Sequence, residues 1–178
     1  MFLDIAFGIF GSYITAHIFH EVITWQLLFL GVVFAILPDI DIVWNLFARK
    51  GDHRSWLHYP YVHILVSLFL FSIGENKIAL LFLITTVFHF VHDTFILGWG
   101  VAWFAPFSYR RFKFFPDNGK GGFLEEKFLT WLPDEQEKME KELDDKHWIR
   151  HWYGRITIIS AIEYTAFLIA VLMVMYTF

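Results

Sequence analysis

Long apolar stretches separated by short polar segments dominate the amino-acid sequence. Five of them approach or exceed the length that crosses the hydrocarbon core of a bilayer. The second and third are short, so their ends are predicted only to within several residues. The pattern predicts an all-α protein, a polytopic membrane bundle of about five hydrophobic helices. The stretches cover residues 2–20, 22–37, 58–73, 77–103 and 156–178.

A long polar interval, residues 104–155, lies between the fourth and fifth stretches. Its later part, EEKFLTWLPDEQEKMEKELDDKHWIRHWYGR, mixes apolar and charged residues as a pair of amphipathic helices does, with a break at 131 to 133. We therefore predict a single membrane domain over residues 1–178. Within it, 104–155 is a helical or interfacial cytoplasmic insertion, either a lid or a solvated hairpin.

The composition agrees with a membrane setting. Hydrophobic residues make up 57% of the chain and 22 residues are Phe, more than the core of a soluble domain of 178 residues requires. The first stretch has neither the basic start nor the cleavage site of a signal peptide, so we expect it to be retained. There are no cysteines, which excludes disulfides and thiolate ligands. Any metal must therefore be held by His and carboxylate side chains.

The basic residues predict the orientation of the chain. Of 14 Lys and Arg residues, three lie between the second and third stretches, one is Lys77, and ten lie between 110 and 155. If the long insertion is cytoplasmic, 13 of the 14 are inside. The amino terminus is then cytoplasmic and the carboxyl terminus is outside. Nothing in this pattern predicts a nucleic-acid partner.

Three short motifs meet near the predicted cytoplasmic boundary. LPDID ends the second stretch, DHRSWLH begins the third, and HFVHD lies in the later half of the fourth, which runs toward the same boundary. Ionisable groups inside a membrane segment are costly unless they have a partner, so they are functional-site candidates. The residues brought to one depth are Asp39, Asp41, His53, His58, His89 and Asp93.

The spacing of these residues favours a metal site. His89 and Asp93 are four apart and share one helical face, where an imidazole and a carboxylate can hold one ion. A ligand set of His and Asp suits zinc, with manganese as an alternative, as one or two ions with room for an activated water. Asp41 or Asp93, where it is not itself a ligand, would be the general base.

Three further histidines favour structural roles. A histidine in an apolar helix is more often hydrogen-bonded to a neighbouring helix than bound to a metal. His63 differs from His58 by about 140° in helical angle. His17 and His20 lie at the outer end of the first stretch, away from the other candidates.

Four other candidates remain open to two interpretations. His92 points about 60° away from His89 on the helix and is a weaker ligand candidate. Glu163, about two turns into the last stretch, is either an acid or base near the site or a hydrogen-bond partner for Tyr or His, and the second role is favoured. Asp39 and Asp41 also suit a turn after the LP dipeptide. The convergence of six groups at one depth favours the metal site.

The motifs resemble the YdjM-type family of inner-membrane metal-dependent hydrolases. The similarity covers about residues 36–115 and rests on LPDID, DHRSWLH, HFVHD and GWGVAWFAPFSYRRFKFF in this order. It implies a catalytic role for Arg54, the basic residue that follows the first histidine of the second motif. The family is similar in architecture to zinc-dependent phospholipases C, which suggests phosphoester chemistry by analogy. The metal-binding set that the resemblance implies is Asp39, Asp41, His53, His58, His89 and Asp93.

Two departures from that family affect the site. The family usually carries a histidine early in its first helix, whereas the comparable FLDIAFGIFG contains only Asp4 as an ionisable side chain. Asp4 either replaces that metal ligand or is a solvated end residue. Trp56 and Leu57 replace small residues between the two histidines, which affects substrate access more than metal binding.

The sequence thus predicts an integral protein of the inner membrane with a metal site facing the cytoplasm. We expect hydrolysis of an ester or phosphoester in a membrane lipid or lipid-like substrate, with the ion activating a bound water. The alternative is a non-catalytic protein that binds or transports a metal with the same ligands. A transport pathway should continue polar residues into the outer leaflet, and the third and fourth stretches are almost purely apolar outside the motifs.

Overall fold

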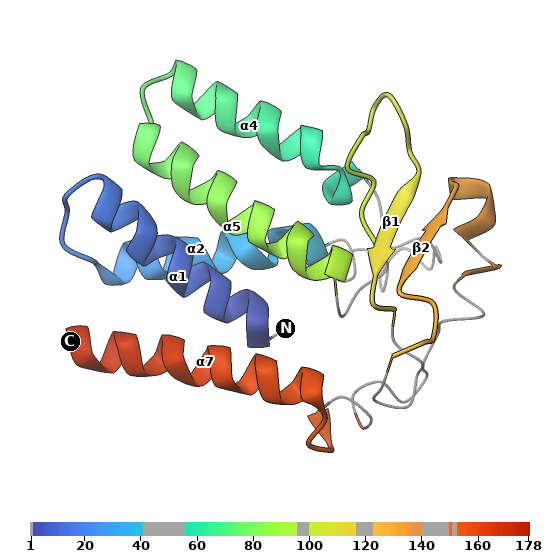
Figure 1. The fold of residues 1–178 in the computed structure, drawn as a ribbon. Coiled ribbons are helices and arrows are strands. Elements are labelled where there is room, and N and C mark those ends of the chain that lie inside the picture. Colours follow the sequence, from blue (N-terminus) through green and yellow to red (C-terminus); the bar gives the residue numbers. More distant parts are fainter. Residues whose placement is uncertain are drawn as a thin grey trace.

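The computed structural model describes residues 2–40, 56–95, 100–116, 123–136, 138–139, 150 and 153–178. Within these residues the chain is mostly helical, and five α-helices run alternately in opposite directions along one axis (Figure 1). A two-stranded ribbon lies at one end of them. The helices are α1 (Phe2–Ile18), α2 (Trp25–Ile36), α4 (Pro60–Ser72), α5 (Asn76–Phe95) and α7 (Ile158–Thr177).

The helices coincide with the five predicted stretches, but not at every end. α5 and α7, with 20 residues each, are long and apolar enough to cross a membrane. α1, α2 and α4 are apolar but shorter, with 17, 12 and 13 residues. The prediction that the fourth stretch continues to residue 103 as one element is wrong, because α5 ends at Phe95 and Val101 forms a β-bridge with Phe112.

Local sequence signals fix several helix ends. The hydroxyl of Thr24 accepts a hydrogen bond from the backbone N–H of Leu27 and caps α2. Thr157 and Ser160 form a reciprocal capping box at the start of α7. Gly74, between α4 and α5, has a φ of +87°, which glycine adopts without strain.

α1 packs against α2, α5 and α7, whereas α4 packs against α5. It approaches α2 closely because Gly8 faces Gly31: a Cβ atom added to Gly8 would lie 2.5 Å from Cα of Val32. The Ser12 hydroxyl strengthens this contact, lying 2.9 Å from the carbonyl oxygen of Gly8 and 3.0 Å from that of Leu27. Small residues at a crossing are typical of helix pairs in membranes.

α7 is attached to α1 by aromatic and polar contacts at both ends. The ring of Phe2 packs edge-on against those of Tyr164 and Phe167, with centroids 5.5 and 5.3 Å apart. At the other end the Tyr13 hydroxyl donates to the carbonyl oxygen of Met173 at 2.9 Å. These contacts hold α7 along most of its length.

Large apolar side chains point outward from α4 and α7. Leu65 and Phe69 on α4, and Leu172 and Met175 on α7, are each more than half exposed. A soluble monomer rarely exposes so much contiguous apolar surface, whereas lipid tails cover such a surface in a membrane. The outer faces of the helices therefore suit a bilayer.

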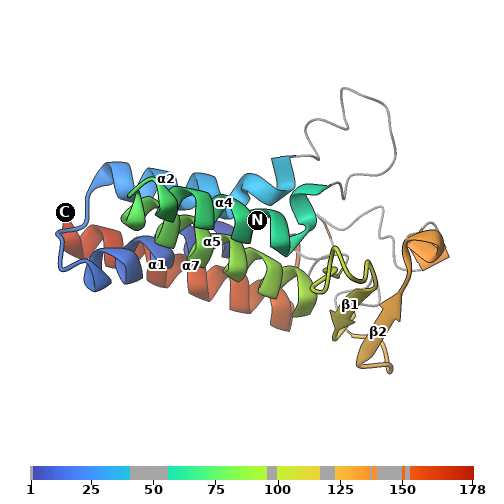
Figure 2. The same ribbon diagram turned by 90° about the horizontal axis from the view of Figure 1, so that it is seen from above.

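The ribbon consists of β1 (Arg111–Phe114) and β2 (Phe128–Trp131), which pair antiparallel. Figure 2 shows it beyond the helix ends. The prediction of helices in the insertion is wrong for these residues, because RFKF alternates charged and aromatic residues with the period of a strand. The predicted break at 131 to 133 coincides with the end of β2 and the start of the 3₁₀ turn η3 (Pro133–Glu135).

The close crossing of α1 and α2 predicts that Gly8→Ala destabilises the fold. The added Cβ meets backbone atoms of α2, which cannot move aside without separating the helices. We expect a loss of about 1–3 kcal/mol, measured as a lower midpoint of thermal unfolding in detergent. Gly11→Ala is the control, because its Cβ meets a methyl group of Thr85 and should cost less. Unchanged unfolding of Gly8→Ala would refute this account of the crossing.

Candidate metal centre

Three elements distant in sequence bring an aspartate and two histidines together. Asp39 ends the turn η1 (Leu37–Asp39), His58 ends the turn η2 (Trp56–His58), and His89 lies near the end of α5. Oδ1 of Asp39 is 3.3 Å from Nε2 of His58 and 3.7 Å from Nε2 of His89. One ligand atom from each of the three residues lies within 4.8 Å of the other two. They form the candidate centre.

Asp93 reaches the same group from one helical turn beyond His89. Its Oδ2 atom is 3.9 Å from Nε2 of His58 and 4.0 Å from Nε2 of His89. The shared helical face that the sequence predicts for His89 and Asp93 is therefore present. Two imidazole nitrogens and two carboxylate groups surround one small volume.

Prolines shape the turns that present Asp39 and His58. Pro38 follows the last turn of α2, and the chain continues as the short η1 turn with Asp39 at its end. Pro60 begins α4, where the missing N–H of proline costs no helical hydrogen bond. His58 therefore sits in η2 just before a helix start, and η1 and η2 lie in contact.

The distances in the centre suit an intervening ion better than direct hydrogen bonds. Ligands on a tetrahedral ion with bonds of about 2.0–2.2 Å lie about 3.3–3.6 Å apart. Three of the four nitrogen–oxygen distances, from 3.7 to 4.0 Å, exceed the reach of a hydrogen bond. Nε2 of His89 is buried and has no hydrogen-bond partner among the described residues. This group of His and Asp side chains could hold a metal ion.

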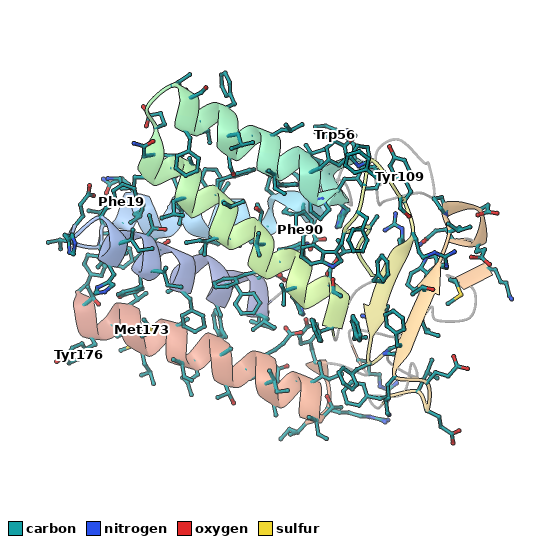
Figure 3. The ribbon with its side chains drawn as sticks, turned by 45° about the horizontal axis from the view of Figure 1, so that its top comes forward. Phe19, Trp56, Phe90, Tyr109, Met173 and Tyr176 are labelled. Atoms are coloured by element: carbon teal, nitrogen blue, oxygen red, sulfur yellow. The ribbon has the colours of Figure 1, made fainter. Side chains whose placement is uncertain are left out.

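The three residues of the candidate centre differ in their exposure. The side chains of His58 and His89 are 1% exposed, whereas that of Asp39 is 33% exposed. Figure 3 shows Phe90, the neighbour of His89, among the helices, and Trp56 and Tyr109 where the helices meet the ribbon. Among these three side chains, Asp39 is therefore the most accessible to solvent.

Asp4 binds the far edges of two imidazole rings. Its Oδ1 atom lies 3.1 Å from Nδ1 of His89 and 3.1 Å from Nδ1 of His92. The residue is 3% exposed, so the interpretation of Asp4 as a solvated end residue is wrong. Because Asp4 contacts Nδ1 while the centre uses Nε2 of His89, it is placed to orient that ligand, as carboxylates commonly do beside metal-bound histidines.

His92 and Glu163 extend this buried network to α7. Nε2 of His92 is 3.9 Å from Oε1 of Glu163. Oε2 of Glu163 accepts a hydrogen bond from the Tyr153 hydroxyl at 3.0 Å and one from the backbone N–H of Leu3 at 3.4 Å. The favoured interpretation of Glu163 as a hydrogen-bond partner of a tyrosine is confirmed. Burial and the neighbouring Glu163 carboxylate raise the pKa of Tyr153 above its ordinary value, so its hydroxyl remains a donor.

The histidines expected to be structural lie apart from the centre. Nε2 of His63 is 2.8 Å from the carbonyl oxygen of Leu57, and its ring stacks on that of Phe82. This hydrogen bond agrees with the structural role and fastens η2 to α4. His17 lies in the last turn of α1 and His20 just after that helix, whose end is opposite the ribbon (Figure 1).

Three predicted site residues, Asp41, His53 and Arg54, lie outside the described residues. Their roles as ligands or catalytic groups stay predictions. The sequence did not identify Asp4 as the partner of His92. The spacing of three between His89 and His92 could have indicated that both rings reach one partner, but it could not identify Asp4 on another helix as that partner.

Comparison with known families gives the assignment that the motifs suggested. Searches of curated proteins and of solved structures found no match. Residues 4–178 match the YdjM inner membrane protein family, so the match includes the centre and all five helices. The chain belongs to the YdjM inner membrane protein family.

Proposed function

We propose that this inner-membrane protein is a divalent-metal-dependent hydrolase that acts on an ester or phosphoester of a membrane lipid or lipid-like molecule. The observation that carries the proposal is the convergence of Asp39, His58, His89 and Asp93 around one volume with an open edge. A closed set of four ligands would suit a structural ion, whereas an accessible edge leaves a position for water and substrate.

The residues of the centre have distinct roles in this proposal. A Zn²⁺ ion, or alternatively Mn²⁺, would supply Lewis-acid chemistry and activate water for hydrolysis. His58 and His89 would hold the ion with Nε2, and the carboxylate of Asp39 would be the third ligand. Asp93 is either a fourth ligand or the general base, since its carboxylate faces the same volume. Asp4 fixes the orientation of the His89 ring.

Exposed aromatic side chains at the same end support a lipid-like substrate. Trp56, Phe104 and Phe107 are each at least 60% exposed and lie beside the turns and ribbon that surround the open edge. Aromatic side chains are favoured at the boundary between hydrocarbon and headgroups. A centre at that depth meets the ester and phosphate groups of lipids without extracting them from the bilayer.

The rival function, metal transport, receives less support from the helix interior. Farther along α5, the hydroxyls of Thr85 and Thr86 donate to carbonyl oxygens of their own helix. Groups used in this way provide poor ligands for an ion that passes between the helices.

The proposed orientation predicts the location of terminal reporters. A reporter fused after Phe178 should be found outside the cytoplasm, and one inserted near Lys120 should be found inside, because basic residues favour the cytoplasmic side. Protease protection or an enzymatic reporter measures this. The reverse pattern would place the centre on the outer face and refute a cytoplasmic site.

The centre predicts which histidines control metal content. His89→Ala and Asp93→Ala should each lower bound zinc several-fold in protein purified without chelators, because each removes a group that faces the ion. His63→Ala is the matched control from a neighbouring buried histidine, and it should retain zinc. Elemental analysis measures the content. Equal loss in all three variants would indicate general misfolding instead of ligand loss.

Metal-dependent hydrolysis predicts a defined activity profile. Turnover of a panel of phospholipids and lipid phosphates should require Zn²⁺ or Mn²⁺ and should fall at acid pH, because metal binding needs neutral imidazoles. Asp39→Asn, which keeps the shape of the side chain, should lower turnover at least tenfold while the unfolding midpoint stays near that of wild type. Metal-loaded protein that hydrolyses no member of the panel would favour the binding or transport function.

A further inference from the structure

We propose a second divalent-cation position between Nε2 of His92 and Oε1 of Glu163, beside the first centre and separate from it. The inference rests on the metal-binding part of the proposed function and not on hydrolysis. Glu163 lies on α7 and His92 on α5, so an ion there would connect the last helix to the rest of the bundle.

Asp4 gives His89 and His92 the same orientation. Oδ1 of Asp4 lies 3.1 Å from Nδ1 of each ring, so each Nδ1–H can donate to that carboxylate. In both rings the Nε2 lone pair then points away from Asp4 and can bind a cation. For His89 this lone pair faces the first centre. For His92 it faces Glu163.

The gap between His92 and Glu163 has the dimensions of a bridged pair. Nε2 of His92 is 3.9 Å from Oε1 of Glu163, beyond the reach of a hydrogen bond and within the 3.3–4.0 Å range of the first centre. His92 is 7% exposed, and its Nε2 atom has no hydrogen-bond partner among the described residues. A buried ring nitrogen without a hydrogen-bond partner is unfavourable unless an ion lies between it and the Glu163 carboxylate.

The Glu163 carboxylate is held so that one oxygen faces His92. Its Oε2 atom accepts hydrogen bonds from the Tyr153 hydroxyl and the Leu3 backbone N–H. These two donors fix the carboxylate plane and leave Oε1 on the side of the His92 ring. Glu163 is 1% exposed, so its carboxylate lies inside the protein beside His92.

The ligand chemistry favours Mn²⁺ or Zn²⁺ at this position. One imidazole nitrogen and one carboxylate oxygen suit these ions, whereas Mg²⁺ and Ca²⁺ prefer oxygen ligands alone. With two protein ligands among the described residues, the position should bind more weakly than the first centre. Water or an oxygen of the substrate can supply the remaining bonds.

Metal stoichiometry tests the second position directly. The full chain in detergent is titrated with Mn²⁺, and bound ion is measured by equilibrium dialysis and elemental analysis. Wild type should bind two equivalents, the second at least tenfold more weakly than the first. Glu163→Gln should bind one, because the amide keeps the hydrogen bonds from Tyr153 and Leu3 but loses the charged ligand.

Two matched variants separate loss of a ligand from loss of structure. Tyr153→Phe removes a hydrogen bond to Glu163 but no proposed ligand atom, so it should still bind two equivalents. His58→Gln should lose the ion of the first centre and keep the one between His92 and Glu163. Glu163→Gln should also keep the unfolding midpoint of wild type measured without metal.

Two outcomes would overturn the inference. A single equivalent in wild type at saturating Mn²⁺, or two equivalents in Glu163→Gln, would mean that His92 and Glu163 form only an ion pair. Neither outcome alters the test of the proposed function, which is hydrolysis by the metal-loaded protein. Conversely, two bound equivalents of Mn²⁺ without hydrolysis would support this inference and would refute the proposed hydrolase function.

Discussion

The carboxylate of Asp4 connects α1 to α5 beside the candidate metal centre. Asp4 on α1 binds two imidazoles of α5 through a single oxygen, His89 on one side and His92 on the other. All three side chains are buried, so each needs its partners, and removing one from such a group leaves the others unsatisfied at a cost of about 3–5 kcal/mol. The relative position of α1 and α5 is therefore tied to the orientation of the two rings. A shift of either helix would turn His89 away from the candidate metal centre.

The rest of the fold places other groups against this pair of helices. Gly8 and Gly31 let α2 approach α1 closely, which sets the position of Asp39 just beyond the end of α2. His63 holds the η2 turn through the carbonyl oxygen of Leu57, next to His58. α7 joins through its contacts with α1 and through Glu163. Asp39 and His58 are thus positioned by packing contacts of residues that are not themselves candidate ligands.

Much of the candidate centre follows from the order of apolar stretches and motifs. Alternating helices bring the end of one stretch and the start of the next to the same side, so LPDID, DHRSWLH and HFVHD must meet at one end. The spacing of four between His89 and Asp93 requires only the period of a helix. The role of Asp4 could not be predicted in this way, because it depends on which helices are neighbours and on their relative rotation. An apolar run also cannot show where α5 ends, since the residues after Phe95 are as apolar as those before it.

The uneven exposure of the ligands bears on how the proposed enzyme would meet its substrate. The two histidines are buried, whereas Asp39 is partly exposed. A pathway through the bundle would need polar groups on both sides of the centre, but Phe90 packs against His63 and Trp103 beside it. Access from the ribbon end requires no such pathway, because the exposed aromatic residues there suit the headgroup boundary. In the proposed function, the substrate would therefore meet the centre at the membrane boundary.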